Sequence, residues 1–88
     1  MLGREVIIIT AEDCLHCIEL EAVLAVAPLS VAHRFIEKGE ATSLFADQTL
    51  FLHSIDVLPF AGIFDDSVCT EVIRAATRER LEEALLQR

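Results

Sequence analysis

The first hydrophobic run of the chain is continuous rather than alternating. Residues 5–10 read Glu-Val-Ile-Ile-Ile-Thr, so four apolar β-branched side chains follow one another without a polar residue between them. A strand with one face in water alternates apolar and polar side chains, whereas a strand covered on both faces is apolar throughout. This run therefore predicts a central β-strand in a sheet that is covered on both sides.

A strongly apolar stretch of helical character follows this strand. Residues 14–26 are rich in Leu, Ala, Val and Ile, with Asp13 available to cap the beginning and Pro28 just past the end. Short polar residues favour helix N-termini, and proline does not continue a helix. We therefore expect a helix over residues 14–26.

The middle of the chain combines a second strand with a second helix. Strand-type residues resume over 29–36, and Glu-Lys-Gly-Glu at 37–40 predicts a turn. Apolar side chains then recur over residues 41–53 at the spacing of one helix face, which predicts an amphipathic helix. Either Thr42 or Ser43 is in place to cap that helix.

The last third of the chain predicts a hairpin followed by a helix. Apolar runs at 60–64 and 68–73 are separated by Asp-Asp-Ser, a short polar connection typical of antiparallel strand pairs. Thr77 can cap a final helix, on whose outer face Arg78 and Glu82 lie four residues apart. The predicted order is β-α-β-α-β-β-α, an α/β fold.

Length, composition and charge narrow the classes of function. A chain of 88 residues, 53% of them hydrophobic, suits a single globular domain over residues 1–88. Fifteen acidic residues against seven Lys and Arg give a net charge of −8, which opposes binding to the phosphates of a nucleic acid. The early apolar run is too short for a signal peptide or a membrane span, so we expect a cytoplasmic protein without membrane contact.

Two of the three cysteines form a Cys-x-x-Cys motif, Cys14-Leu15-His16-Cys17. An odd and small number of cysteines argues against a secreted disulfide framework. A Cys-x-x-Cys pair directly after a strand, at the beginning of a helix in a β-α-β pattern, indicates a redox-active dithiol. Residues three apart share a helix face, so these two sulfurs can form a disulfide.

The position of each cysteine on the helix indicates its role. Cys14, in the first turn, meets unpaired N–H groups and the positive end of the helix dipole, which favour the thiolate and make it the attacking cysteine. Cys17, one turn further on and facing the core, would resolve the mixed disulfide. His16 would support the Cys14 thiolate by charge or hydrogen bonding, while Glu12 and Asp13 would oppose it.

The remaining candidates have simpler interpretations. A Cys-x-x-Cys pair is also half of a zinc site, but no second Cys or His pair follows at ligand spacing, so we expect no bound metal and no cofactor. His33, His53 and Cys69 are interpreted as structural residues. Pro59, at the threshold of an apolar run, marks a strand start, an edge or a cis turn.

Taken together, these features resemble the thioredoxin superfamily over nearly the full length of the chain. The resemblance rests on the Cys-x-x-Cys helix, the segment Ser-Ile-Asp-Val-Leu-Pro at 54–59, and the hairpin before a last helix. It implies a four-stranded mixed sheet flanked by helices, and thiol–disulfide oxidoreductase activity on a disulfide-containing protein or small-thiol substrate. It further implies that Pro59 is cis and packs against the disulfide, and that Leu58 offers backbone groups to an extended substrate. The electron donor would be a reductase or a low-molecular-weight thiol.

The chain departs from the family pattern at several positions. Leu-His separates the cysteines where thioredoxins have Gly-Pro, and a His before the second Cys is similar to the periplasmic disulfide oxidases, which implies a less reducing potential. Ile8 replaces the family's buried acid, so proton delivery to Cys17 would come from His16 or Glu12. Ala-Ala at 75–76 replaces the glycine pair of glutaredoxins, which argues against specific glutathione binding.

Two other functions remain open on the sequence. One is a soft-metal carrier, because ferredoxin-like copper and zinc chaperones also place Cys-x-x-Cys between a first strand and a first helix. The other is a non-catalytic thioredoxin-like binding module in which the cysteines only staple the beginning of the helix. We expect the protein to be a monomer.

Overall fold

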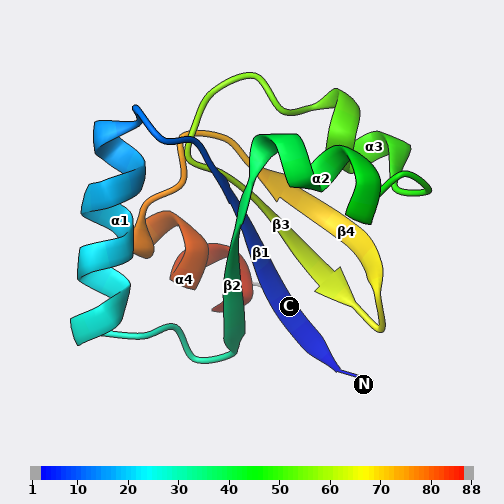
Figure 1. The fold of residues 1–88 in the computed structure, drawn as a ribbon. Coiled ribbons are helices and arrows are strands. Elements are labelled where there is room, and N and C mark those ends of the chain that lie inside the picture. The colour runs from blue at the N-terminus through cyan, green and yellow to red at the C-terminus, as the bar shows by residue number, and fades with distance from the viewer. Residues whose placement is uncertain (1–2, 87–88) are drawn as a thin grey trace.

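A computed structural model describes residues 3–86 of the chain. Four strands and four helices follow one another in the order β1 (Arg4–Thr10), α1 (Leu15–Val26), β2 (Ala32–Glu37), α2 (Lys38–Leu44), α3 (Thr49–His53), β3 (Phe60–Asp65), β4 (Val68–Ile73) and α4 (Arg78–Leu86) (Figure 1).

The strands form one mixed sheet in the order β2-β1-β3-β4. β1 pairs in parallel with β2 and antiparallel with β3, and β3 pairs antiparallel with β4. The hairpin between β3 and β4 turns at Asp66 and Ser67, both in the left-handed region with φ of 52° and 73°. The α/β fold with a four-stranded mixed sheet and the predicted antiparallel hairpin are both confirmed.

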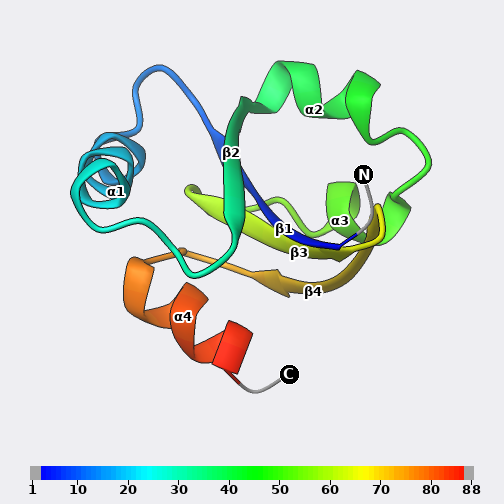
Figure 2. The same cartoon turned by 90° about the horizontal axis from the view of Figure 1, so that it is seen from below.

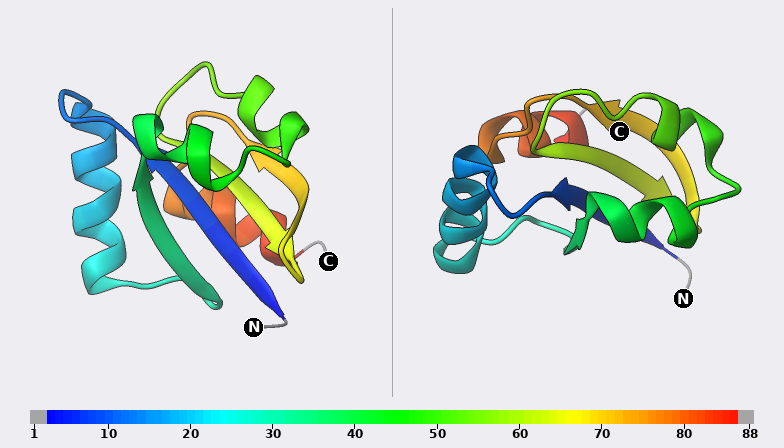
Figure 3. Two further views of the ribbon diagram at one scale, coloured as in Figure 1. Left: turned by 45° about the vertical axis from the view of Figure 1, so that its right-hand side comes forward. Right: turned by 45° about the horizontal axis from the view of Figure 1, so that its top comes forward.

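Helices cover both faces of the sheet, which explains the continuous apolar run in β1. α1 and α4 lie on one face and α2 and α3 on the other (Figures 2 and 3). Val6 and Ile8 belong to the core under α1 and α4, whereas Ile7 and Ile9 belong to the core under α2 and α3. Because successive side chains of a strand point to opposite faces, only an unbroken apolar run fills both cores.

A cluster of phenylalanines fills the core under α2 and α3. The ring centroid of Phe51, from α3, lies 5.1–5.6 Å from those of Phe45, Phe60 and Phe64. Phe51 also lies directly against Gly62 of β3, where a Cβ atom would come within 2.7 Å of the ring. Because Gly62 has no side chain, the Phe51 ring can occupy the space beside β3.

The predicted helix over residues 41–53 is wrong, because two short helices take its place. α2 begins at Lys38, so the turn predicted at 37–40 is its first turn, and neither Thr42 nor Ser43 caps it. The break falls between α2 and α3, where Gln48 Oε1 accepts a hydrogen bond from the Cys69 N–H of β4 at 3.1 Å. The break thus allows the chain to contact the edge strand while both helices still reach the core.

Smaller differences concern where elements begin. The second strand begins at Ala32 instead of residue 29, while Leu29 is buried in the core beneath α1 and α4. α1 begins at Leu15, and its N-cap is Cys14 instead of Asp13. The predicted Thr77 cap of α4 is confirmed, since its Oγ1 accepts a hydrogen bond from the Arg80 N–H at 3.2 Å.

Candidate redox site

Cys14 occupies the N-cap position of α1. Its backbone is extended, with φ of −97° and ψ of 102°, and its Sγ accepts a hydrogen bond from the Cys17 N–H at 3.1 Å. An N-cap side chain normally supplies an oxygen to one of the unpaired N–H groups of the first turn, and here a sulfur does so. The strand-to-helix turn therefore places this sulfur at the positive end of the helix dipole.

Cys14 and Cys17 are joined by a disulfide. Their Cα atoms lie 5.2 Å apart, within the usual range for a disulfide. Cys14 is partly exposed, whereas Cys17 is only 3% exposed and faces the core, as predicted. An approaching thiolate or disulfide can therefore reach Cys14 but not Cys17.

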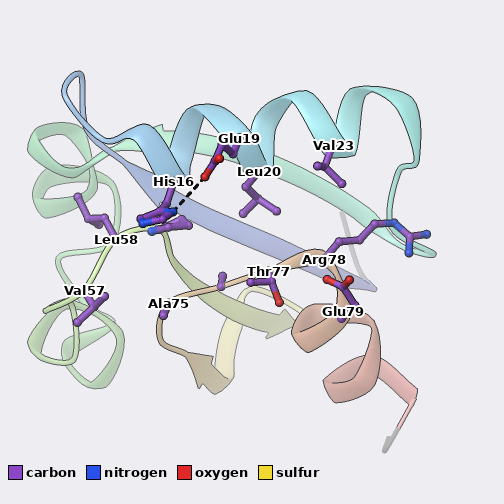
Figure 4. Close-up of a pocket in the computed structure, with 12 residues that line it drawn as sticks. His16, Glu19, Leu20, Val23, Val57, Leu58, Ala75, Thr77, Arg78 and Glu79 are labelled. Atoms are coloured by element: carbon purple, nitrogen blue, oxygen red, sulfur yellow. Dashed lines mark hydrogen bonds and ion pairs between the residues drawn. The ribbon is translucent and has the colours of Figure 1, made fainter.

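His16 lies between the two cysteines and points away from the core. Its side chain is 82% exposed, and its Nδ1 lies 3.0 Å from Glu19 Oε1, one helical turn further along α1 (Figure 4). The observed partner of the imidazole in this oxidised state is thus a carboxylate. A contribution of His16 to the Cys14 thiolate stays a prediction.

The Leu58–Pro59 peptide bond is cis, as the resemblance implied. Pro59 is buried, and its carbonyl oxygen accepts a hydrogen bond from the Ala76 N–H at 2.8 Å. Ala75, next to it, has a φ of 50° in the left-handed region. The proline segment and the segment that leads into α4 are therefore held side by side.

A groove of about 610 Å³ runs beside the dithiol helix. One wall consists of His16, Glu19, Leu20 and Val23 of α1, and the other of residues 57–59 and 75–79. Figure 4 shows His16 and Leu58 at the same end of this groove. The structure thus brings three of the predicted site residues, His16, Leu58 and Pro59, to one groove.

An ion pair ties the two segments of the second wall together. The Nε and Nη2 of Arg74 donate to the two carboxylate oxygens of Asp56, the first at 3.0 Å. The hydrogen bonds from Arg74 hold the pKa of Asp56 below its usual value, and the same contact raises the pKa of Arg74. We call this ion pair the Asp56–Arg74 clamp. Asp56 lies two residues before Leu58, and Arg74 lies one residue before Ala75.

The other candidates lie outside the groove. Cys69 is 9% exposed, and burial raises the pKa of its thiol, so it stays protonated and packs as a small apolar residue. The ring of His33 packs edge-on against Phe35, with centroids 5.7 Å apart, and His53 is exposed at the end of α3. Within residues 3–86, no three His, Cys, Asp or Glu side chains are grouped to hold a metal ion.

Sequence reasoning did not assign the charged residues in and beside the groove to the site. Glu19 could have been found, because it lies three residues after His16 on a predicted helix and therefore shares its face. Glu79 and the Asp56–Arg74 pair carried no such signal, since their neighbours come from distant parts of the chain.

The comparisons with known proteins bear on the fold. No protein-family model and no curated protein sequence matches the chain. No helix among residues 3–86 is both long enough and apolar enough to span a bilayer.

Solved structures of thioredoxins match nearly the whole chain at low sequence identity. A mutant thioredoxin from Halobacterium salinarum has a TM-score of 0.72 and 17% identity, over 98% of this chain and 74% of that one. The thioredoxin of Fasciola hepatica has a TM-score of 0.67 and 16% identity, over 97% and 80%. Oxidised thioredoxin O2 from Arabidopsis thaliana has a TM-score of 0.64 and 20% identity, over 97% and 74%. The chain therefore has the thioredoxin-like fold, with a Cys14–Cys17 pair at the beginning of α1.

Proposed function

We propose that this protein is a thiol–disulfide oxidoreductase that works through Cys14 and Cys17. The observation that carries the proposal is the asymmetry of the pair. The Cys14 sulfur caps α1 and is partly exposed, whereas Cys17 is buried behind it. Such an arrangement suits one attacking and one resolving sulfur, because the helix N-terminus favours a thiolate at Cys14.

The reaction proceeds in two exchange steps. The Cys14 thiolate attacks one sulfur of the substrate disulfide, so a mixed disulfide forms and the first substrate sulfur leaves as a thiolate that takes up a proton. The Cys17 thiolate then attacks Cys14 Sγ, which forms the Cys14–Cys17 disulfide and releases the second substrate thiolate. Two electrons pass from the cysteine pair to the substrate, and the reverse sequence oxidises a dithiol.

The residues around the pair support each step. His16 would assist the Cys14 thiolate by its positive charge or by a hydrogen bond, and Leu58 and Pro59 would align an extended substrate segment. Ile8 is fully buried, and no polar or charged side chain within the described chain is buried. The proton that Cys17 loses before it attacks, and regains in the reverse sequence, would therefore pass through the exposed side, by His16 or Glu12.

The proposal extends to partners and setting. The substrate would be a disulfide-containing protein or a small disulfide, and a reductase or low-molecular-weight thiol would return two electrons to the pair. We propose a monomer in a cytoplasmic compartment, where a reduced pair is maintained. The alternative of a soft-metal carrier loses its support from the fold, since it rested on a ferredoxin-like arrangement of strands.

A turnover assay with two single variants tests the proposal. The reduced protein should reduce a peptide disulfide with multiple turnovers in the presence of a dithiol. Cys14→Ser should abolish turnover because the attacking sulfur is lost, whereas Cys69→Ser should retain it because the Cys69 thiol is buried and outside the groove. Turnover by Cys14→Ser at a rate close to that of the unchanged protein would remove the proposal.

A further inference from the structure

The groove is lined by more acidic than basic side chains. Its charged wall residues are Glu19, Arg78 and Glu79, besides the titratable His16. Both carboxylates are exposed. The charge that a substrate would meet in the groove therefore depends on whether the Arg78 guanidinium faces it.

The Arg78 guanidinium forms its hydrogen bonds at the end of α1. Its Nε donates to the carbonyl oxygen of Ala27 at 2.7 Å, and its Nη2 donates to that of Pro28 at 3.4 Å. The same Nη2 lies 3.8 Å from Glu82 Oε1. Figure 4 shows the guanidinium beyond Val23, at the end of the groove away from His16. The positive charge of Arg78 therefore lies at the end of α1. The accessible charged groups of the groove are the carboxylates of Glu79 and of Glu19, whose Oε1 lies 3.0 Å from His16 Nδ1.

The N-terminus of α4 also meets the groove and would favour an anion. Two features oppose that effect here. Thr77 Oγ1 already accepts the Arg80 N–H, and Glu79 places a carboxylate in the first turn. An acidic substrate group would thus meet a helix N-terminus whose positive dipole is already offset, next to the negative charge of Glu79.

Most of the other residues that line the groove are apolar. Val23 and Val57 are 46% and 48% exposed, and Leu58 lies between Val57 and the buried Pro59. Lys and Arg side chains cover such surface with their methylene stems while their charged ends remain in contact with water or a carboxylate. The combination of apolar wall and exposed carboxylate suits those side chains.

The length of the groove sets which substrate positions would reach it. From His16 to Val23 the helix rises by about 10 Å, which an extended chain spans with about three residues. A substrate cysteine bonded to Cys14 would therefore place its next few neighbours beside Glu19 and Glu79.

We propose, on the basis of the function proposed above, that the groove selects disulfide substrates with Lys or Arg within three residues of the reacting cysteine. Glu19 and Glu79 set this preference. Disulfides with acidic neighbours, glutathione disulfide among them, are disfavoured.

Three peptide disulfides test the preference. They are symmetrical dimers of one short single-cysteine peptide whose flanking positions carry Lys, Gln or Glu. Each kcat/KM is divided by the rate at which dithiothreitol reduces the same dimer, which removes differences in intrinsic reactivity. Two exposed ion pairs predict a ratio of Lys dimer to Glu dimer of up to about tenfold at low salt. The ratio should approach one at about 1 M salt, where the Debye length is about 3 Å.

A pair of double variants separates the groove from the net charge of the protein. E19Q/E79Q should reduce the ratio at least about threefold. E21Q/E83Q removes the same charge from exposed positions on the same two helices outside the groove and should leave the ratio unchanged. Because the readout is a ratio, an effect of Glu19 on His16 and hence on the overall rate cancels.

Each outcome decides a different point. Equal normalised rates for the three dimers would overturn the charge preference while leaving the proposed function intact. An equal loss of the ratio in both double variants would assign the preference to net charge instead of the groove and would also overturn it. No reduction of any dimer by the unchanged protein would overturn the proposed function and the preference together.

Discussion

Cys14 has two structural roles, as the N-cap of α1 and as the exposed half of the disulfide. Both roles come from one feature, the extended backbone that joins β1 to α1. A residue at this position points its side chain back at the first turn, so its sulfur lies where the helix dipole favours negative charge. The sulfur that caps α1 is therefore also the sulfur that we propose as the nucleophile.

The Asp56–Arg74 ion pair predicts a pH dependence of stability. The pKa of Asp56 is lower in the folded protein than in the unfolded chain, so the pair stabilises the fold above the unfolded value of 3.8. This contribution is lost as the pH falls through the folded value. Asp56→Asn should therefore lower the urea midpoint at about pH 6 and lower it less at about pH 2.

A carboxylate outside the pair controls for general acid effects. Asp47 is exposed in the segment between α2 and α3, so Asp47→Asn should change the urea midpoint little at either pH. If Asp56→Asn shifts the midpoint equally at both pH values, the ion pair does not account for the effect.

The close contact between Gly62 and Phe51 predicts a large effect of one methyl group. Gly62→Ala would bring a Cβ within 2.7 Å of the Phe51 ring and should destabilise the fold by about 1–3 kcal/mol. Gly39→Ala, in α2 with no heavy atom within 4 Å of the new Cβ, should be neutral or stabilise by up to about 1 kcal/mol. Urea denaturation of both variants provides the comparison, and similar midpoints would contradict this account of the Phe51 core.

At the scale of elements, α1 and α4 cover the same face of the sheet but contribute different parts of the site. α1 carries the dithiol and one wall of the groove, whereas α4 contributes its first turn to the other wall. The position of α4 depends on the Ala76–Pro59 hydrogen bond and on the Thr77 cap. Changes at the beginning of α4 should therefore affect both stability and the groove.

The Thr77 cap can be tested by two substitutions. Thr77→Ala removes the hydroxyl that accepts the Arg80 N–H and should cost about 1 kcal/mol of unfolding free energy. Thr77→Ser keeps the hydroxyl and should cost much less. Chemical denaturation distinguishes the two, and equal losses would indicate that the Thr77 methyl group, not the cap, stabilises this helix.

The elements that the sequence predicts well are those with a strong local pattern. The unbroken run at 6–9 predicts a strand covered on both faces, and the Asp-Asp-Ser connection between two apolar runs predicts the hairpin. The helix at 41–53 was predicted wrongly because the apolar spacing continues across the break. At that break Gln48 contacts β4, which is distant in sequence.

At the scale of the whole molecule, the fold brings two distant segments to the helix that carries the dithiol. Cys14 and Cys17 were predictable because their spacing and place after a strand are local features. The groove was not, because residues 57–59 and 75–79 are distant from α1 in the sequence and approach it only in the folded chain. The Asp56–Arg74 clamp illustrates the limit, since 18 residues separate two side chains that no periodicity relates.

The motif predicts a redox potential for the molecule. We expect the Cys14–Cys17 couple to be less reducing than thioredoxin at about −270 mV, because His16 favours the thiolate form of the reduced pair. Equilibration in glutathione buffers followed by alkylation and mass measurement gives the potential. His16→Gln should move it toward more reducing values, and an unchanged potential would remove His16 from the account.

Trapping the mixed disulfide tests the central claim most directly. Cys17→Ser lacks the resolving sulfur, so on reaction with a peptide disulfide it should accumulate one peptide on Cys14, as shown by intact mass and peptide mapping. The unchanged reduced protein should instead release the peptide and form the Cys14–Cys17 disulfide. Attachment at Cys69, or no adduct under conditions in which the unchanged protein reduces the peptide, would contradict the assignment of Cys14 as attacking sulfur and Cys17 as resolving sulfur.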